Sequence, residues 1–144
     1  MKNKILFSII VAIMSLWLTS CNDKPIPPAQ LPTQITTFIQ QNFPGQTISY
    51  AEKDWDWGTQ YEVTLIDGTH VKFDTDNVWD KIECPMKGVP ATIVPSPVAN
   101  YLNANFPGIV ITKIDKEHYG YEIDLINGME LKLNKQGAIM EMDD

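Results

Sequence analysis

The chain has 144 residues, of which 44% are hydrophobic and 20% are charged, and its formal net charge is −7. That length suits one ordinary domain or two very small ones, and the hydrophobic fraction is enough to build a core, so wholesale disorder is excluded. The acidic balance argues against nucleic acid as a partner, because neutralising phosphates needs clustered Lys and Arg, and Arg is absent. Two His and two Cys leave little material for a multi-ligand metal centre.

The first twenty residues have the pattern of an export signal. Lys2 and Lys4 precede an apolar run from Ile5 to Leu18, which is too short to span a bilayer comfortably. We therefore predict a signal peptide over residues 1–20. The run ends in Leu18-Thr19-Ser20-Cys21, which resembles a bacterial lipobox, so we expect Cys21 to be lipidated and the chain to be cleaved behind Ser20. The alternative is plain secretion, with Cys21 as an ordinary thiol.

Lipidation would make the acyl chains the only membrane attachment. Removing residues 1–20 takes away two lysines and no acid, so 9 Lys against 18 acids leave −9, a charge that anionic lipid repels. Residues 21–30 are rich in proline and are predicted to be a tether. The expected location is the cell envelope, either facing the periplasm or at the cell surface. Cys84 is then left without an intramolecular partner, and its place on an apolar strand face favours a buried, inert thiol over a reactive one.

An internal repeat follows. At a constant offset of 63, residues 27–45 match residues 90–108, including Asn-Phe-Pro-Gly at the end of each segment. At an offset of 60, Tyr61–Gly68 matches Tyr121–Gly128. We therefore predict two copies of one unit, residues 26–84 and 89–144, with three extra residues in the first copy around Trp55-Asp56-Trp57.

Each unit is predicted to open with a helix. In the second unit, Ser96 is the expected N-cap and Pro97 the first helical residue. Apolar residues then recur at helical spacing, and the same spacing recurs in the first unit: Val98, Tyr101, Leu102 and Phe106, against Ile35, Phe38, Ile39 and Phe43. Both helices should end before a proline, at Pro44 and Pro107, because the residue before proline disfavours helical geometry.

Period-two alternation after each helix predicts strands. The first strands are expected at 48–53 and 109–115. In the following hairpin, a three-residue loop over 66–68 pairs Val63 with Val71, whereas a two-residue loop would pair Val63 with Lys72 and put charge on the apolar face. We therefore predict the three-residue loop, with the glycine left-handed in a bulge, and the same arrangement at Gly128.

Fourth strands at 78–84 and 138–142 complete the units. The face of the former is undecided, because its apolar residues do not alternate cleanly. The predicted fold class is α+β: a tandem repeat of two units, each a helix packed on a four-stranded antiparallel sheet. Units of about 60 residues are marginal alone, so we expect them to pack against each other across the linker at residues 85–89.

At these residues the chain resembles the PepSY-like family of exported Bacteroidetes-type proteins, whose tandem units are likened to the beta-lactamase inhibitor protein. The resemblance rests on the doubled Asn-Phe-Pro-Gly, on Tyr-Glu-Val/Ile-x-Leu-Ile-x-Gly, and on Lys87-Gly88-Val89-Pro90-Ala91. It implies a non-catalytic envelope module that binds or inhibits a peptidase or another extracytoplasmic protein. No catalytic residue and no inhibitory loop carries over onto this chain.

The extended hairpin supplies the candidate binding residues. Exposed tryptophan at a loop tip is typical of interface anchors, so Trp55, Asp56 and Trp57 are a candidate protein-binding site. Tyr50 and Trp79 are candidate neighbours, although residues of these types are more often core than contact. The alternative is that both loop rings fold back over the sheet edge or the seam between the units.

Other polar groups favour structural roles. The segment Asp74–Asn77 lacks the glycine and the glutamate of an EF-hand loop, so a turn is expected there, and His70 and His118 lie too far apart for a metal pair. Carboxylates on the non-core sheet face could serve as an acid and a base, although a salt-bridged solvated face gives the same pattern: Glu62, Glu122, Asp124 and Glu130, with Lys72 and Lys132. We expect no catalytic, cofactor or metal site. A structural envelope component and a hydrolase are the alternative functions.

Overall fold

The computed structural model describes residues 24–54 and 59–144. Its helices are α2 (Thr33–Asn42) and α3 (Ser96–Asn105), each preceded by a short 3-10 turn, η1 (Pro28–Gln30) or η2 (Ala91–Ile93). The strands are β1 (Lys24–Pro25), β2 (Ile48–Lys53), β3 (Thr59–Leu65), β4 (His70–Asp74), β5 (Trp79–Glu83), β6 (Ile111–Glu117), β7 (Gly120–Leu125), β8 (Glu130–Asn134) and β9 (Ile139–Asp143).

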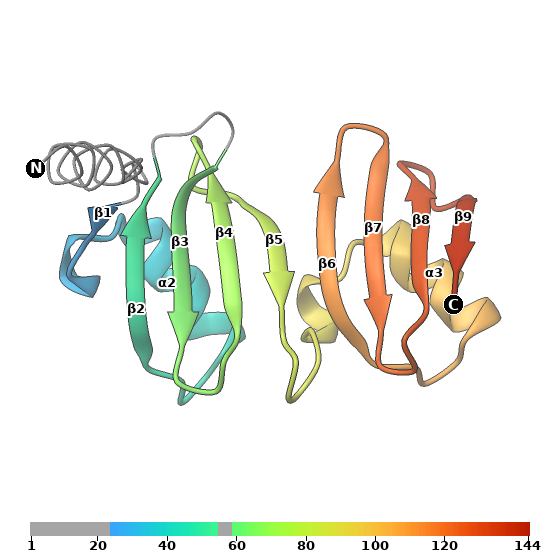
Figure 1. Ribbon diagram of the computed structural model, residues 1–144, viewed down its shortest axis with the longest axis horizontal. Coiled ribbons are helices and arrows are strands. Elements are labelled where there is room, and N and C mark those ends of the chain that lie inside the picture. Colours follow the sequence, from blue (N-terminus) through green and yellow to red (C-terminus); the bar gives the residue numbers. More distant parts are fainter. Residues whose placement is uncertain (1–23, 55–58) are drawn as a thin grey trace, which may run out of the picture.

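All the described strands belong to one antiparallel sheet of nine strands, which follow one another in chain order. Strands β5 and β6 pair directly, with Ile82 opposite Ile114, so the sheet runs without a break from the first half of the chain to the second. Two separate four-stranded sheets, as predicted, are therefore not found. Joining the halves satisfies backbone groups that two free strand edges would have left unpaired. Figure 1 shows both helices behind this sheet, on the same side.

The core lies between the helices and the sheet face that they cover. Each helix buries two residues against the sheet, Ile35 and Ile39 from α2 and Val98 and Leu102 from α3. Alternate residues of the strands meet them: Val63, Leu65, Val71, Phe73, Ile82, Ile114, Ile123, Leu125, Leu131 and Leu133 are all buried. One contiguous core therefore extends under both helices.

The predicted hairpin register is confirmed. Val63 lies opposite Val71, and Tyr61 lies opposite Phe73. The three-residue loop closes with Leu65 N–H donating to the Thr69 carbonyl at 2.8 Å. Gly68 has φ +84° and Gly128 has φ +93°, the left-handed geometry that this turn requires.

A β-bulge explains why the face of β5 could not be decided from the sequence. Phe73 lies opposite Trp79 while Lys72 lies opposite Lys81, so Asp80 has no partner on β4. The extra residue shifts the alternation by one position, and Trp79 and Ile82 both face the core. Strand β9 has the same bulge at Met140.

The C-terminal ends of both helices agree with the prediction, but the N-terminal end of α3 does not. Both helices end where expected, with Phe43 and Phe106 as the C-cap residues directly before prolines. Helix α3, however, begins at Ser96 itself, and its N-cap is Pro95, without a side-chain capping bond. The predicted capping role of Ser96 is therefore wrong, because the helix starts one residue earlier than the proline pattern indicated.

Among the described residues, no helix is both long and apolar enough to cross a membrane. The predicted signal peptide and Cys21 lie outside the described residues, so export and lipidation stay predictions.

Candidate functional site

The candidate site is the sheet face that the helices leave uncovered, which we call the open face (Figure 1). Its residues alternate with the core residues along β3 to β8 and are mostly charged: Glu62, Thr64, His70, Lys72, Lys81, Glu83, Lys113, Asp115, Glu122, Asp124, Glu130 and Lys132. Lysines and acids lie on neighbouring strands and pair with one another. The predicted salt-bridged face is thus present, and it spans both halves.

Charge pairs join β5 and β6 at the junction of the two halves. Lys81 Nζ lies 3.0 Å from a Glu83 carboxylate oxygen and 3.8 Å from an Asp115 oxygen. Burial raises the pKa of Asp115 above its usual value. Burial acts in the same direction on Glu83, but the hydrogen bond and charge of Lys81 outweigh it and lower the pKa of that carboxyl. One lysine therefore holds both carboxylates in an ion-pair ladder across the junction.

The first half of the open face contains a closed hydrogen-bonded network. His70 lies between two partners, with Nδ1 3.0 Å from Thr64 Oγ1 and Nε2 3.0 Å from a Glu62 oxygen. The other Glu62 oxygen accepts a hydrogen bond from Lys72 Nζ. Burial lowers the pKa of Lys72, but this bond and the charge of Glu62 outweigh it, so the pKa lies above the usual value. Each polar group of the network thus has a partner.

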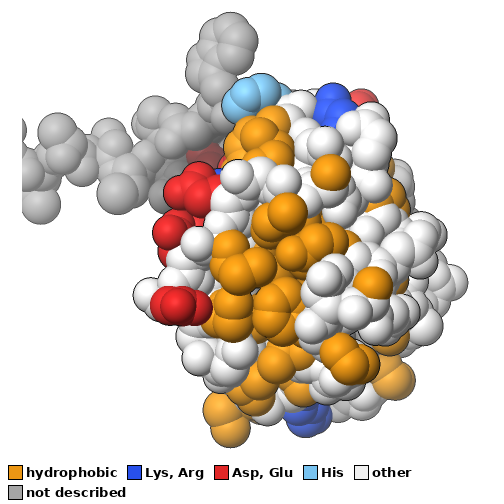
Figure 2. Space-filling model, turned by 90° about the vertical axis from the view of Figure 1, so that its right-hand side faces the viewer, with side chains coloured by type: hydrophobic (Ala, Val, Ile, Leu, Met, Phe, Trp, Pro, Cys, Tyr) orange, Lys and Arg blue, Asp and Glu red, His pale blue; other side chains and the backbone are white. Residues whose placement is uncertain are grey.

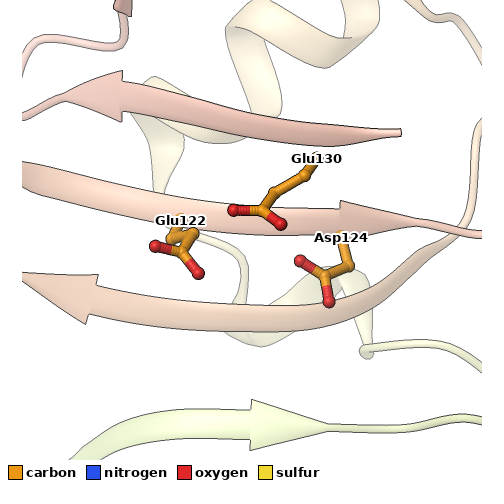
Figure 3. A group of neighbouring side chains, drawn as sticks. All are labelled: Glu122, Asp124 and Glu130. Carbon is orange, nitrogen blue, oxygen red and sulfur yellow. The ribbon is translucent and has the colours of Figure 1, made fainter. Parts of the chain in front are cut away.

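The same positions in the second half hold three carboxylates. Glu122, Asp124 and Glu130 each offer one oxygen within 4.8 Å of the others, and Figure 3 shows their side chains converging across neighbouring strands. Lys113 Nζ lies 3.1 Å from Glu122 and 3.6 Å from Asp124. The Oδ1 atom of Asp124 is buried and has no hydrogen bond. Three carboxylates are part of the oxygen set that Ca²⁺ prefers, which has six to eight members.

Sequence reasoning placed these acids on the open face but missed their convergence. Asp124 lies directly opposite Glu130 in the β7–β8 pairing. The register predicted for the first hairpin, moved by 60 residues, would have placed the two side chains together.

The predicted protein-binding residues fall into three groups. Trp55, Asp56 and Trp57 lie outside the described residues. Tyr50 is 45% exposed on β2, and its hydroxyl donates to a Glu52 carboxylate at 2.9 Å. Trp79 is only 8% exposed, and Lys116 Nζ lies 3.6 Å from the centre of its ring. Trp79 therefore lies in the core, which is one of the two places that the sequence left open for it, because the bulge in β5 turns the ring inward.

The remaining candidates have structural roles. Asp74 Oδ1 accepts hydrogen bonds from the backbone N–H groups of Asp76 and Val78, so this carboxylate closes the predicted turn. His118 is exposed in the β6–β7 turn, away from His70. Cys84 is 2% exposed, so its predicted burial is confirmed, and burial raises the pKa of its thiol to about 11, which favours the inert thiol over the reactive one.

Two hollows adjoin these elements. One, of about 310 Å³, lies on the open face at the junction and is lined by Glu83, Lys113 and Asp124. The other, also about 310 Å³, lies between α3 and the start of β6, where Leu102, Phe106 and Ile109 contribute to its wall. Lys87 is the only ionisable residue in its lining. The first hollow contains two carboxylates with Lys113 beside them, and the lining of the second contains no acid.

The described residues thus form a single antiparallel sheet with two helices on one side and a surface of paired charges on the other. The chain belongs to the family described as "Putative beta-lactamase-inhibitor-like, PepSY-like", whose sequence pattern matches residues 16–57 and 59–141. No curated protein matches the chain.

Solved structures of similar proteins come from Bacteroides. A "putative periplasmic protein" of the DUF2874 family from Bacteroides vulgatus is 32% identical, with a TM-score of 0.79 over 85% of this chain and 98% of its own. A "putative calcium-regulated periplasmic protein" from Bacteroides thetaiotaomicron is 31% identical, with a TM-score of 0.77 over 85% and 97%. A third, of unknown function and from Bacteroides vulgatus, is 30% identical, with a TM-score of 0.75 over 85% and 99%. These relatives support an extracytoplasmic location for the chain.

Proposed function

We propose that the protein is a non-catalytic binding module of the cell envelope, which holds another extracytoplasmic protein against the open face of its sheet. The observation that carries the proposal is the one-sided architecture: both helices cover one face, and the described residues place no layer on the other. The words "beta-lactamase-inhibitor-like" in the family description favour an inhibitory outcome of this binding. Our proposal is that the partner is a peptidase or another envelope protein, which the module inhibits or regulates.

The chemistry of the open face supports this role. Half-buried charges in fixed pairs favour a partner with the complementary charge pattern and disfavour others. Tyr50 adds an exposed aromatic ring, a residue type that often carries much of the binding energy at an interface. The hairpin with Trp55 and Trp57 is the second part of the proposed contact surface.

The test compares recovery of cross-linked partner from envelope extract by the full chain and by variants. Tyr50 lies opposite Thr64 in the β2–β3 pairing and shares its face, so Tyr50→Ala and Lys81→Glu both alter the open face. The control, Gln40→Glu with Gln41→Glu, changes the charge by the same −2 as Lys81→Glu but lies on the exposed side of α2. We expect both open-face variants to lose at least about tenfold in recovered partner, with unchanged recovery by the control. Equal recovery by all variants, at unchanged melting temperatures, would contradict the proposal.

The tryptophans are tested with the same partner. The double change Trp55→Ala with Trp57→Ala should weaken binding by more than about 2 kcal/mol, the usual threshold for a hot spot. The melting temperature should stay nearly unchanged. A large loss of stability would show instead that the rings belong to the core.

Lipid anchoring is part of the proposal and is tested by fractionation. Cys21→Ser should release the protein from the membrane fraction, because the acyl chains are the only attachment that the sequence predicts. A variant that still sediments with membranes would show that the lipobox interpretation is wrong.

A second candidate function is regulation by calcium. It is favoured by the description of the Bacteroides thetaiotaomicron relative as calcium-regulated and by the three carboxylates on the open face. Binding at Glu122, Asp124 and Glu130 would require Ca²⁺ to displace Lys113 from two of them. The resulting change in charge lies on the open face, in the half formed by β7 and β8.

Thermal unfolding with and without calcium tests this candidate. Extracellular calcium modules bind with dissociation constants of about 0.1 to 1 mM, so about 10 mM Ca²⁺ should raise the melting temperature of the full chain. Asp124→Asn with Glu130→Gln should abolish the rise. Glu62→Gln is the control, because Glu62 is the first-half counterpart of Glu122. This variant should keep the calcium-dependent rise in melting temperature. An unshifted melting temperature of the unmodified chain would rule the candidate out.

A further inference from the structure

The two edges of the sheet are built differently. Strand β1 is two residues long and contains Pro25, a feature that prevents further strand pairing. Strand β9 has five residues and no proline, and the described residues place no strand on its outer side. Its apolar residues Ile139, Met140 and Met142 are 43%, 57% and 44% exposed. Figure 2 shows this end of the molecule, with hydrophobic side chains gathered in the middle and acidic side chains along one side.

The first half shows what covers a strand of this kind. At the repeat offset of 60 residues, Trp79 and Ile82 of β5 occupy the positions of Ile139 and Met142. They are 8% and 0% exposed, although β5 and β9 share the same bulge. The difference is that β6 pairs with the outer side of β5. The exposure of β9 therefore reflects the lack of an equivalent neighbouring strand.

The β5–β6 pairing also shows which neighbour fits. Ile82 lies opposite Ile114, and this apolar pair is flanked by two pairs of opposite charge, Lys81 with Asp115 and Glu83 with Lys113. The corresponding residues of β9 are an apolar residue between two acids: Met142, Glu141 and Asp143. A strand that matches β9 therefore has an apolar residue between two basic ones, since opposite charges across a strand pair stabilise it and like charges destabilise it.

A second copy of the chain does not meet this requirement. If two β9 strands paired antiparallel with Met142 opposite Met142, each Glu141 would lie opposite an Asp143 of the other copy. If Glu141 lay opposite Glu141, the clash of like charges would be direct. Addition of the β1 edge of another copy is disfavoured by its proline.

We propose that β9 takes up an extended strand from a different protein by strand addition, and that this strand carries a basic, an apolar and a basic residue opposite Asp143, Met142 and Glu141. Main-chain hydrogen bonds supply the affinity, and the alternating side chains supply the specificity. The added strand would cover Ile139 and Met142 as β6 covers Trp79 and Ile82. This surface is the sheet edge, so the proposal does not depend on binding at the open face.

The test uses two synthetic peptides that copy residues 111–117. One carries Asp115→Lys and so has the basic–apolar–basic pattern, and the other carries Lys113→Glu with Asp115→Glu and has the acidic pattern. Binding to the full chain is measured by fluorescence anisotropy, and amide exchange locates the site. We expect the basic peptide to bind at least about tenfold more tightly, which is about 1.4 kcal/mol, and to protect the amides of β9.

Charge reversal separates pairing at the edge from general attraction between a basic peptide and an acidic protein. Glu141→Lys and, independently, Asp143→Lys should each remove or reverse the preference for the basic peptide. Asp76→Lys makes the same change in net charge in the exposed β4–β5 turn and should leave the preference intact. Lys81→Glu, on the open face, should leave it intact as well, which distinguishes this proposal from the open-face one. Equal binding of both peptides, an unaltered preference in both β9 variants, or protection elsewhere than β9 would overturn the proposal.

Discussion

The two halves of the molecule present different chemistry on the same backbone. In the first half, Thr64 lies opposite His70, and hydrogen bonds join this pair to Glu62. In the second half, Asp124 lies opposite Glu130, and the like charges are relieved by Lys113 from the neighbouring strand. The repeat therefore conserves positions but not interactions on the open face. Differences in function between the halves should follow from these substitutions, since the backbone is shared.

In the core, unlike on the open face, the two halves have equivalent residues in equivalent surroundings. Val63 and Ile123 occupy matching positions and are both completely buried. Val63→Asp and Ile123→Asp should each unfold the protein, or lower its free energy of unfolding by more than about 4 kcal/mol, since a charge would be buried without a partner. Chemical denaturation of the full chain measures the effect.

The matched control is Thr64→Asp, next to Val63 but on the open face. It introduces the residue that already stands at the equivalent position, Asp124, and should change stability by less than about 1 kcal/mol. Equal midpoints for Val63→Asp and Thr64→Asp would contradict the assigned faces of β3.

Much of the fold follows from the sequence because the repeat doubles each signal. The proline stops, the left-handed Gly68 and Gly128, and the hairpin register were all predicted from local rules. Two features were not predictable in that way. The bulge at Asp80 changes the facing of β5 without any marker in the residue types, and the pairing of β5 with β6 is a long-range contact between the halves.

A second contrast is in burial. Cys84 is buried, whereas its counterpart at the repeat offset of 60, Asp144, is exposed. Burial disfavours the thiolate and raises the pKa of the folded thiol from its ordinary value of 9.0 to about 11. Between these values the unfolded chain loses the proton while the folded chain keeps it, so stability falls as the pH rises from 9 to 11. Two pKa units correspond to about 2 to 3 kcal/mol at most.

Cys84→Ala removes this contribution. The variant should lose less stability than the unmodified protein between pH 8 and pH 11, as measured by urea denaturation at each pH. Parallel curves for the two proteins over that range would show that the thiol does not titrate differently on folding.

A third contrast lies in the turns that precede β5 and β9. Asn77 adopts φ 59°, and its counterpart Gly137 adopts φ 83°. A Cβ atom on Gly137 would lie 2.6 Å from the Pro97 carbonyl oxygen, which belongs to α3. Gly137→Asn should therefore cost about 2 kcal/mol, whereas Asn77→Gly should change stability by less than about 0.5 kcal/mol. Similar melting temperatures for both variants would argue against the close packing of this turn on α3.

The candidate site was less predictable than the fold. The acids of the open face are visible in the sequence, but the convergence of Glu122, Asp124 and Glu130 depends on a pairing across two strands. The exposure of Ile139 and Met142 depends on the absence of a neighbour, which no local pattern encodes. Only the comparison with β5 in the folded structure shows that the same strand type is buried elsewhere.

The smallest expected effect comes from exchanging the chemistry of the two halves. Asp124→Thr with Glu130→His gives the second half the residues of the first, and replaces two opposed carboxylates by a pair that can hydrogen-bond as Thr64 and His70 do. We expect the free energy of unfolding at low ionic strength to rise by up to about 1 kcal/mol, the range for cross-strand pairs. Added salt should then stabilise the variant less than the unmodified protein, because screening no longer relieves repulsion between the two acids.

The reverse exchange, Thr64→Asp with His70→Glu, should lower the free energy of unfolding by a similar amount and increase its salt dependence. If both exchanges are destabilising to the same degree and respond equally to salt, then the two networks are not interchangeable, and the equivalence of the halves ends at the core.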